Sequence, residues 1–303
     1  MWKKINKIKK YIFVSYLISI LFLYPLPVAM SSVVTNSSNV LEEKKTIDQN
    51  DVICFQKQYW AVLIGINDYP GTWGDLPYSI SEINSFKKTL LTKGNWKESH
   101  IKMITDAEAT HDNIIDALEW LGEQETSLDV SIVYFVGHGG KIDKNYSFSA
   151  YNSKIFDYEL DAVFDSFDGR IVLIMDCCNS GGFVETVKGR GRMIMAACDK
   201  DGLTYQYKPL KSGFFGYFLN VTLEKLTNTA EMTFLIAAPI TYLYSCRLSK
   251  ELGEDYIVKP KASDMTLGLT VLIKPRWMHT FKISLNELIP HYPKLYKDEL
   301  WVL

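Results

Sequence analysis

Two apolar segments of this chain end in residues that could support nucleophilic chemistry. The segment Val130–Gly140 (VSIVYFVGHGG) delivers His138, and the segment Arg170–Gly182 (RIVLIMDCCNSGG) delivers Cys178. A thiol beside an imidazole is the minimum equipment of a cysteine nucleophile, because the imidazole can take up and return the proton. If the segments are neighbouring strands of a parallel sheet, both side chains lie at its carboxyl edge, where sites of open α/β sheets form.

The residues around each side chain favour this chemistry over a structural role. A single cysteine after a buried strand is more often structural, but Cys178 leads into a glycine turn whose free amides can stabilise a thiolate. His138 lies between glycines, so we expect it to promote thiolate formation and to protonate a leaving amine. The backbone N–H groups of Gly139 and Cys178 would then form an oxyanion hole.

The cysteine pattern leaves two further interpretations open. Cys177 precedes Cys178 directly, and strand alternation predicts that Cys177 is buried whereas Cys178 enters the turn. A strained disulfide between the two would switch the site off. A thiol redox protein is a rival, although adjacent cysteines lack the spacing of redox CxxC motifs. None of the five cysteines lies in a zinc-binding pattern, so we expect no structural zinc.

Strand-like and helix-like patterns alternate through the middle of the chain. Continuous apolar strands separated by helices predict a mainly parallel sheet with helices on both faces. A helix with Ile114 and Leu121 on its apolar face is expected to begin at Thr110 or Asp112. The other predicted helices are 80–91, 214–226 and 239–252, and the predicted strands are 59–66, 101–105, 130–136, 171–175, 192–197 and 265–273.

Charge and hydrophobicity divide the chain into four parts. Residues 1–30 carry five lysines, no acids and an apolar run over residues 11–30, which predicts a signal peptide or an N-terminal membrane anchor and therefore export. Residues 31–57 read as a polar linker, 58–275 as the catalytic α/β domain, and 276–303 as a C-terminal tail packing on it.

The charge balance also bears on partners. Outside residues 1–30 the chain has 28 basic and 35 acidic residues, a net charge of −7 that argues against nucleic acid and anionic membrane surfaces as partners. Membrane contact is therefore expected only through the N-terminal segment, if it is retained. A polypeptide substrate is the expected partner, and the sequence predicts no particular oligomeric state.

The motifs GHGG (137–140) and DCCNSGG (176–182) together resemble the caspase, metacaspase and legumain clan of cysteine peptidases, particularly its prokaryotic metacaspase-like branch. The resemblance extends to residues 64–83, 189–198 and 212–219, and it covers roughly residues 59–226. It implies a caspase-like three-layer α/β fold with a mainly parallel central sheet.

The resemblance also implies roles for individual residues. It makes Cys178 the nucleophile, His138 its partner, and Asp176 part of the S1 pocket that receives the substrate's P1 side chain. Glu82 falls where the family usually has an aspartate. Two acids in such a pocket would select Arg or Lys, with bidentate pairing for Arg.

Alternatives remain for these acids. Ser79-x-x-Glu82 fits a capping box, which needs no substrate. Asp176 could instead be hydrogen-bonded inside the turn, and Asp199 is a further pocket candidate. Asn179 stands where the family often has His or Tyr, and it is one of several departures from the family's pattern that bear on the P1 preference and on any calcium dependence.

We therefore expect a cysteine endopeptidase that works through a His–Cys dyad and a thioester acyl-enzyme, cleaving after Arg or Lys. The chemistry requires no cofactor, and a calcium requirement is suggested by the resemblance alone. The alternative is a catalytically silent caspase-like binding or scaffold module, against which the intact pair His138 and Cys178 argues.

Overall fold

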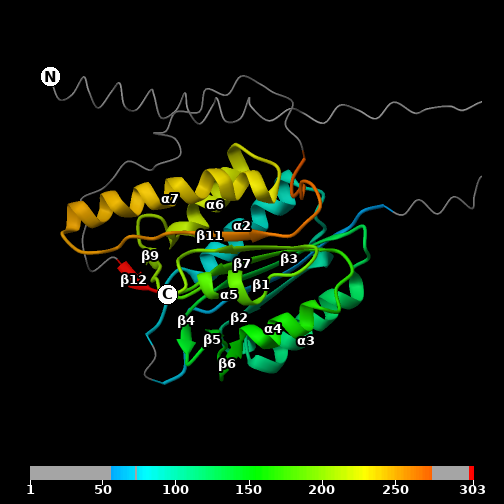
Figure 1. Cartoon of the computed structure of the whole chain (residues 1–303), viewed down its shortest axis with the longest axis horizontal. Coiled ribbons are helices and arrows are strands. Elements are labelled where there is room, and N and C mark those ends of the chain that lie inside the picture. The colour runs from blue at the N-terminus through cyan, green and yellow to red at the C-terminus, as the bar shows by residue number, and fades with distance from the viewer. Residues whose placement is uncertain (1–55, 72–73, 275–299) are drawn as a thin grey trace, which may run out of the picture. The chain divides into compact units, whose positions relative to one another are not determined.

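A six-stranded sheet forms the centre of the computed structural model, which describes residues 56–71, 74–274 and 300–303 (Figure 1). The strand order is β11-β8-β7-β3-β1-β2. Every pairing is parallel except that of β11, which joins β8 antiparallel. The strands are β1 (Tyr59–Gly65), β2 (Ile101–Thr105), β3 (Val130–Val136), β7 (Arg170–Asp176), β8 (Arg192–Ala196) and β11 (Lys261–Asp264).

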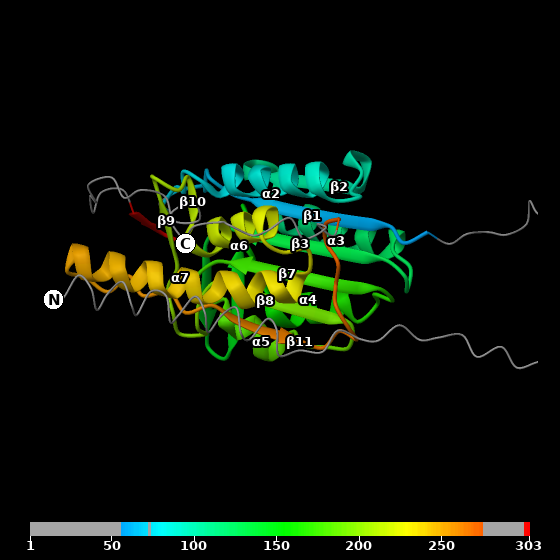
Figure 2. The same cartoon turned by 90° about the horizontal axis from the view of Figure 1, so that it is seen from above.

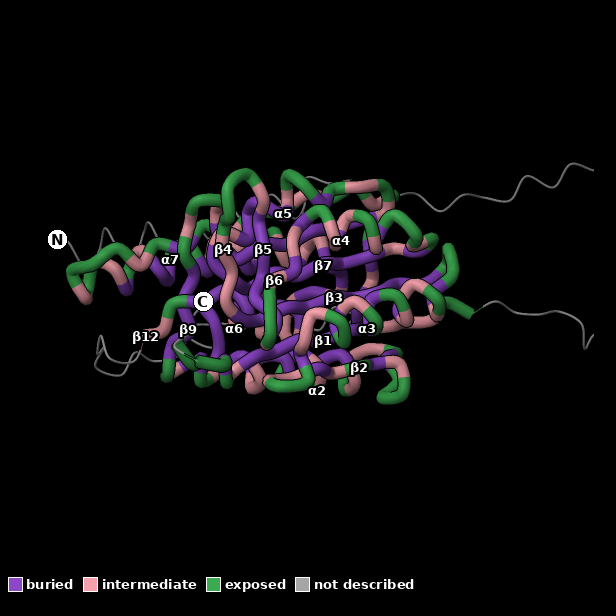
Figure 3. Tube along the Cα trace, turned by 90° about the horizontal axis from the view of Figure 1, so that it is seen from below, coloured by how far each residue is buried: buried purple, intermediate pink, exposed green. Residues whose placement is uncertain are grey.

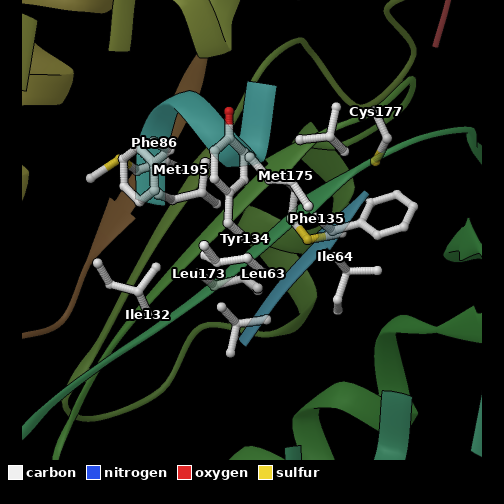
Figure 4. Packing of buried hydrophobic residues seen from close by; sticks show 14 of the residues in the cluster. Leu63, Ile64, Phe86, Ile132, Tyr134, Phe135, Leu173, Met175, Cys177 and Met195 are labelled. Atoms are coloured by element: carbon white, nitrogen blue, oxygen red, sulfur yellow. The ribbon is translucent and has the colours of Figure 1, made fainter. Parts of the chain in front are cut away.

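The inner strands are buried because helices cover both faces of the sheet. All of β3 is buried, and in β7 only Arg170 is partly exposed, as continuous apolar runs predict. Figure 4 shows Phe86 and Tyr134 side by side above the sheet, where their rings meet edge to face with centroids 5.1 Å apart. These contacts hold the carboxyl ends of β3 and β7 on a rigid base.

The described residues form six α-helices, three on each face of the sheet. Figure 2 shows α2 (Ser79–Lys93), α6 (Phe214–Lys225) and α7 (Ala230–Leu252) on one face. Figure 3, from the opposite side, shows α3 (His111–Gln124), α4 (Asp157–Phe164) and α5 (Gly181–Thr186) over the other face, with buried strands behind them. The predicted three-layer, mainly parallel α/β fold is confirmed.

Two small antiparallel sheets lie at the end of the molecule where β3 and β7 finish (Figure 1). One has the order β4-β5-β6 and follows β3 directly; the other has the order β10-β9-β12 and follows β8. Their strands are β4 (Gly139–Ile142), β5 (Asn145–Ser149), β6 (Lys154–Phe156), β9 (Tyr205–Tyr207), β10 (Ser212–Gly213) and β12 (Leu300–Val302).

Two predicted elements were placed wrongly. The last helix begins at Ala230, not at Pro239, because Thr229 caps it by accepting a hydrogen bond from the N–H of Met232, and it continues through the proline. The strand predicted over 265–273 is instead β11, whose place is set by pairing with β8. The apolar side chains of Leu267 and Leu269 are exposed.

Other predictions were tested in part or not at all. Thr110 caps α3 as expected, accepting from the N–H of Asn113. None of the described helices is long and apolar enough to cross a membrane. The predicted signal peptide or anchor (1–30) and nearly all of the linker (31–57) lie outside the described residues. So does the tail over residues 276–299; only its last four residues are described, and they pack on β9.

Candidate active site

Parallel pairing of β3 with β7 brings the segments that carry His138 and Cys178 to the same edge of the sheet. Val136 lies opposite Asp176, and the N–H of Gly137 donates to the Asp176 carbonyl oxygen at 3.4 Å. His138 and Cys178 therefore stand at equivalent positions, each two residues beyond the last pair. A Cβ on Gly139 would lie 2.3 Å from the Cys178 carbonyl oxygen, so only glycine allows the two segments to approach this closely.

The turn after Cys178 is fixed by its own backbone. Asn179 adopts a left-handed conformation (φ 58°), which asparagine tolerates better than most residues, and its N–H donates to the Gly202 carbonyl oxygen at 2.9 Å. Ser180 accepts a hydrogen bond from the N–H of Cys198 at 3.2 Å. The cysteine is thus held between the ends of β7 and β8.

The Cys178 thiol is almost completely covered, with 3% of the residue exposed. Its Sγ accepts a hydrogen bond from the N–H of Thr204 at 3.4 Å. Burial raises the pKa of this thiol to about 12, although the Thr204 bond acts in the opposite direction. In this state the thiol is protonated, and all four described cysteines (177, 178, 198 and 246) are free, with no disulfide between Cys177 and Cys178.

The imidazole of His138 is oriented by a backbone carbonyl. Its Nε2 lies 2.7 Å from the Gly74 carbonyl oxygen, which can only accept, so Nε2 carries the proton in this contact. Tyr69 supports the same residue: its hydroxyl accepts from the His138 N–H at 3.0 Å, and its ring centroid lies 4.8 Å from the imidazole. Burial lowers the pKa of His138, which favours the neutral ring.

Glu82 faces the end of the sheet and not its own helix terminus. It accepts hydrogen bonds from the hydroxyls of Tyr134 (2.5 Å) and Ser212 (2.8 Å) and from the N–H of Gly213 (2.6 Å). The residue before the helix is Tyr78, and no side chain caps α2. The capping-box interpretation of Glu82 is therefore wrong.

Asp176 lies beside Glu82 and is likewise buried. It accepts from the N–H of Gly216 at 2.8 Å and from the Thr204 hydroxyl at 3.4 Å, so its partners lie outside the turn that follows Cys178. Burial, with the neighbouring carboxylate, raises the pKa of Asp176 well above its usual range, and burial also raises that of Glu82. Neither acid forms an ion pair with a described Lys or Arg, so the pair retains a proton.

The two remaining candidate groups, the Asp199 carboxylate and the Cys178 N–H, each have a partner within the chain. Asp199 pairs with Lys261 at 2.9 Å and does not join the two buried acids. The N–H of Cys178, expected in the oxyanion hole, donates to the carbonyl oxygen of Leu303 at 3.2 Å. Within the described ranges, no group of three or more His, Cys, Asp or Glu side chains could hold a metal ion.

The site thus combines an imidazole and a thiol at the carboxyl edge of a parallel sheet with helices on both faces. This is the arrangement of an α/β protein of the cysteine-peptidase class. A family model, the caspase domain, matches residues 58–255. The chain therefore belongs to the caspase-domain family of cysteine peptidases, as the motifs at His138 and Cys178 indicated.

The individual relatives are more distant. Metacaspase-6 of Arabidopsis thaliana is 29% identical over 146 residues, covering 42% of this chain and 39% of that protein. Metacaspase-1 of Candida albicans is 34% identical over 88 residues, covering 27% of this chain and 19% of that protein. Each match thus spans less than half of the relative's length.

A solved structure supports the fold alone. The crystal structure of protein GSU0716 from Geobacter sulfurreducens superposes with a TM-score of 0.54 at 14% identity. The match covers 72% of this chain and 97% of that one. At this identity the likeness concerns architecture and not chemistry.

Sequence reasoning missed the supports of the site. Gly74 and Tyr69 hold the imidazole, Thr204 contacts both the thiol and Asp176, and Tyr134 binds Glu82. Tyr134 could have been suspected, because a hydroxyl in a continuous apolar strand needs a buried partner. The others act through backbone groups or across long sequence separations, which leave no local pattern.

The buried acid pair predicts a dependence of stability on pH. Because the folded-state pKa values of Asp176 and Glu82 are raised, the native state keeps a proton that the unfolded chain releases. The free energy of unfolding should therefore be highest below the ordinary carboxyl range and fall as pH rises above about 4, by up to about 1.4 kcal/mol per pH unit. Urea unfolding at pH 5 and pH 8 measures the fall, which Asp176→Asn should reduce.

The matched control is Asp116→Asn, which makes the same chemical change at an exposed position of α3 and should keep the wild-type pH dependence. If Asp176→Asn and wild type lose the same free energy between the two pH values, the acid pair does not hold the proton assigned to it.

Proposed function

We propose that this protein is a cysteine endopeptidase in which Cys178 is the nucleophile and His138 its proton-transfer partner. The observation that carries the proposal is the pairing of Val136 with Asp176, which sets both side chains at equivalent positions beyond adjacent strands. Membership of the caspase-domain family supports the same assignment.

The proposed reaction has two halves. Sγ of Cys178 attacks the carbonyl carbon of the scissile peptide bond and passes its proton to His138. The C–N bond breaks, the leaving amine takes that proton, and a thioester remains on Cys178. Water then attacks the thioester with His138 as base, which releases the carboxylic acid and restores the thiol. The amides of Gly139 and Cys178 would stabilise the oxyanion in both halves.

We further propose that the substrate carries Arg or Lys at P1. Asp176 precedes the nucleophile by two residues and lies beside Glu82, and neither acid has a described cation as partner. A guanidinium would supply the missing positive charge and displace the retained proton. A calcium requirement stays a suggestion of the family resemblance alone.

Removal of either member of the dyad should abolish cleavage. For Cys178→Ala and for His138→Ala we expect the hydrolysis of fluorogenic peptides by the full chain to fall at least about a thousandfold, because each removes an essential part of one unit. Cys246→Ala, a change at a half-buried cysteine on α7, should keep activity within about twofold.

The peptide-hydrolysis assays of these variants are run both with and without added calcium. Folded wild-type protein that neither cleaves any peptide nor reacts at Cys178 with a basic acyloxymethyl ketone would indicate a silent binding module. Cleavage that survives Cys178→Ala would contradict the assignment of the nucleophile.

The P1 proposal predicts discrimination between arginine and citrulline, which have nearly the same shape but differ in charge. Wild type should cleave after Arg with a kcat/KM at least about tenfold above that after citrulline, because only arginine brings a cation to the acid pair. In Asp176→Asn this ratio should shrink. Equal rates for the two peptides in wild type would rule out charge selection by these acids.

We also propose that residues 1–30 export the chain, with cleavage after the small-residue pattern near Ala29 or with retention as an anchor. The lysine-rich start and the apolar run support this. N-terminal sequencing of the extracytoplasmic protein should find a start near residue 31 if it is cleaved, and Met1 in a membrane fraction if it is retained. Recovery of intact chain only from the soluble cytoplasmic fraction would overturn export.

A further inference from the structure

The last four residues of the chain lie in the candidate active site. Strand β12 adds to β9 as an antiparallel neighbour, with Val302 opposite Tyr205 and Trp301 opposite Gln206. Figure 1 shows β12 in red beside β9, at the end of the sheet where β4 begins. Adding a strand to an exposed edge is a common way for a domain to bind an extended peptide.

The backbone of Leu303 continues this pairing to the nucleophile. Its N–H donates to the Thr204 carbonyl oxygen at 3.0 Å, and its own carbonyl oxygen accepts from the N–H of Cys178 at 3.2 Å. The Cys178 N–H is the group assigned above to the oxyanion hole. The Leu303 carbonyl oxygen thus accepts the hydrogen bond that the proposed oxyanion hole would give to a scissile carbonyl, which would make Leu303 the counterpart of a P1 residue.

The side chains alternate as they would in a bound peptide strand. Leu303 is 1% exposed, whereas Val302 is 47% exposed and points to solvent. The ring of Trp301 meets that of Tyr78 edge to face, with centroids 5.5 Å apart. Tyr78 is itself tied to the same edge, since its N–H donates to the side-chain oxygen of Gln206 at 2.9 Å.

We propose that Leu300–Leu303 is a resident inhibitor that occupies the edge of β9, where a substrate strand would bind, and covers Cys178. This inference rests on the proposed peptidase function for its meaning. The inhibitor binds noncovalently and no bond is made or broken. Its P1 counterpart is a leucine, which lacks the positive charge proposed for substrates, so it occupies the edge of β9 without pairing with the acid pair as a substrate would.

Burial of the thiol agrees with this arrangement. Cys178 is 3% exposed with Leu303 hydrogen-bonded to its N–H, and burial raises the pKa of its thiol. Release of the segment would expose the sulfur to water and free the Cys178 amide. Activation therefore requires that the strand leaves β9, either by competition from a substrate strand or by removal of the segment.

The experiment measures access to Cys178 directly. Iodoacetamide alkylation is followed by mass spectrometry in the full chain, in a chain ending at Glu299, and in full-length Leu303→Asp, which places a charge at a buried position. Both changes should raise the alkylation rate of Cys178 at least about tenfold, because two hydrogen bonds and a buried leucine no longer close the site. Leu267→Asp, the same change at a residue 76% exposed, should leave it unchanged.

Two control measurements test whether the variants are folded and whether the effect depends on the tail sequence. Cys177 is completely buried, so continued protection of Cys177 shows that a variant is folded. The peptide Leu-Trp-Val-Leu, added to the chain ending at Glu299, should slow Cys178 alkylation again, whereas Val-Leu-Leu-Trp should not. If the shortened chain exposes Cys177, the full-length Leu303→Asp protein carries the test.

Peptide hydrolysis by the same proteins separates the two proposals. A parallel rise in alkylation and hydrolysis supports both. Faster alkylation without hydrolysis of any peptide leaves the inhibitor assignment in place and counts against the peptidase. An unchanged alkylation rate in both tail variants overturns the inhibitor assignment, whatever the hydrolysis assay gives.

Discussion

The register between β3 and β7 is the constraint on which the site depends. Because the side-chain period of a strand is two residues, a slip of one position would turn His138 and Cys178 to opposite faces. Val136 opposite Asp176 prevents this, and the contact between Gly139 and Cys178 leaves no room for another register. The buried apolar side chains of both strands stabilise the pairing, so the relative placement of His138 and Cys178 is a consequence of core packing.

The buried acids connect this edge to the helical layer above it. Glu82 is carried by α2 and Asp176 by β7, and both accept hydrogen bonds from residues between Ser212 and Gly216 at the start of α6. Burying two carboxyl groups without a cation is costly unless a proton is kept. The cost is tolerable because each carboxyl oxygen accepts a hydrogen bond.

Features of the structure that depend on neighbouring residues could be predicted from the sequence, whereas those that depend on residues far apart in the chain could not. The strands around His138 and Cys178 were predictable, because continuous apolar runs ending in glycine are local signals. Ser79-x-x-Glu82 was misleading, because the carboxylate binds Ser212 and Gly213, more than a hundred residues away, and not its own helix end. The strand predicted over 265–273 was wrong because pairing with β8, and not apolarity, placed β11.

The pairing of β12 with β9 was the least predictable contact, and it alters the interpretation of the site. Nothing local in Leu-Trp-Val-Leu distinguishes a strand that packs on the domain from one that fills a groove. The distinction lies in two backbone hydrogen bonds at Leu303, one to Thr204 and one from Cys178. Because Thr204 also donates to the Cys178 sulfur and to Asp176, a single residue links strand β12, Cys178 and the acid pair. Departure of the strand would therefore change the environment of both functional groups at once, so that exposure of the thiol and opening of the P1 position form one event.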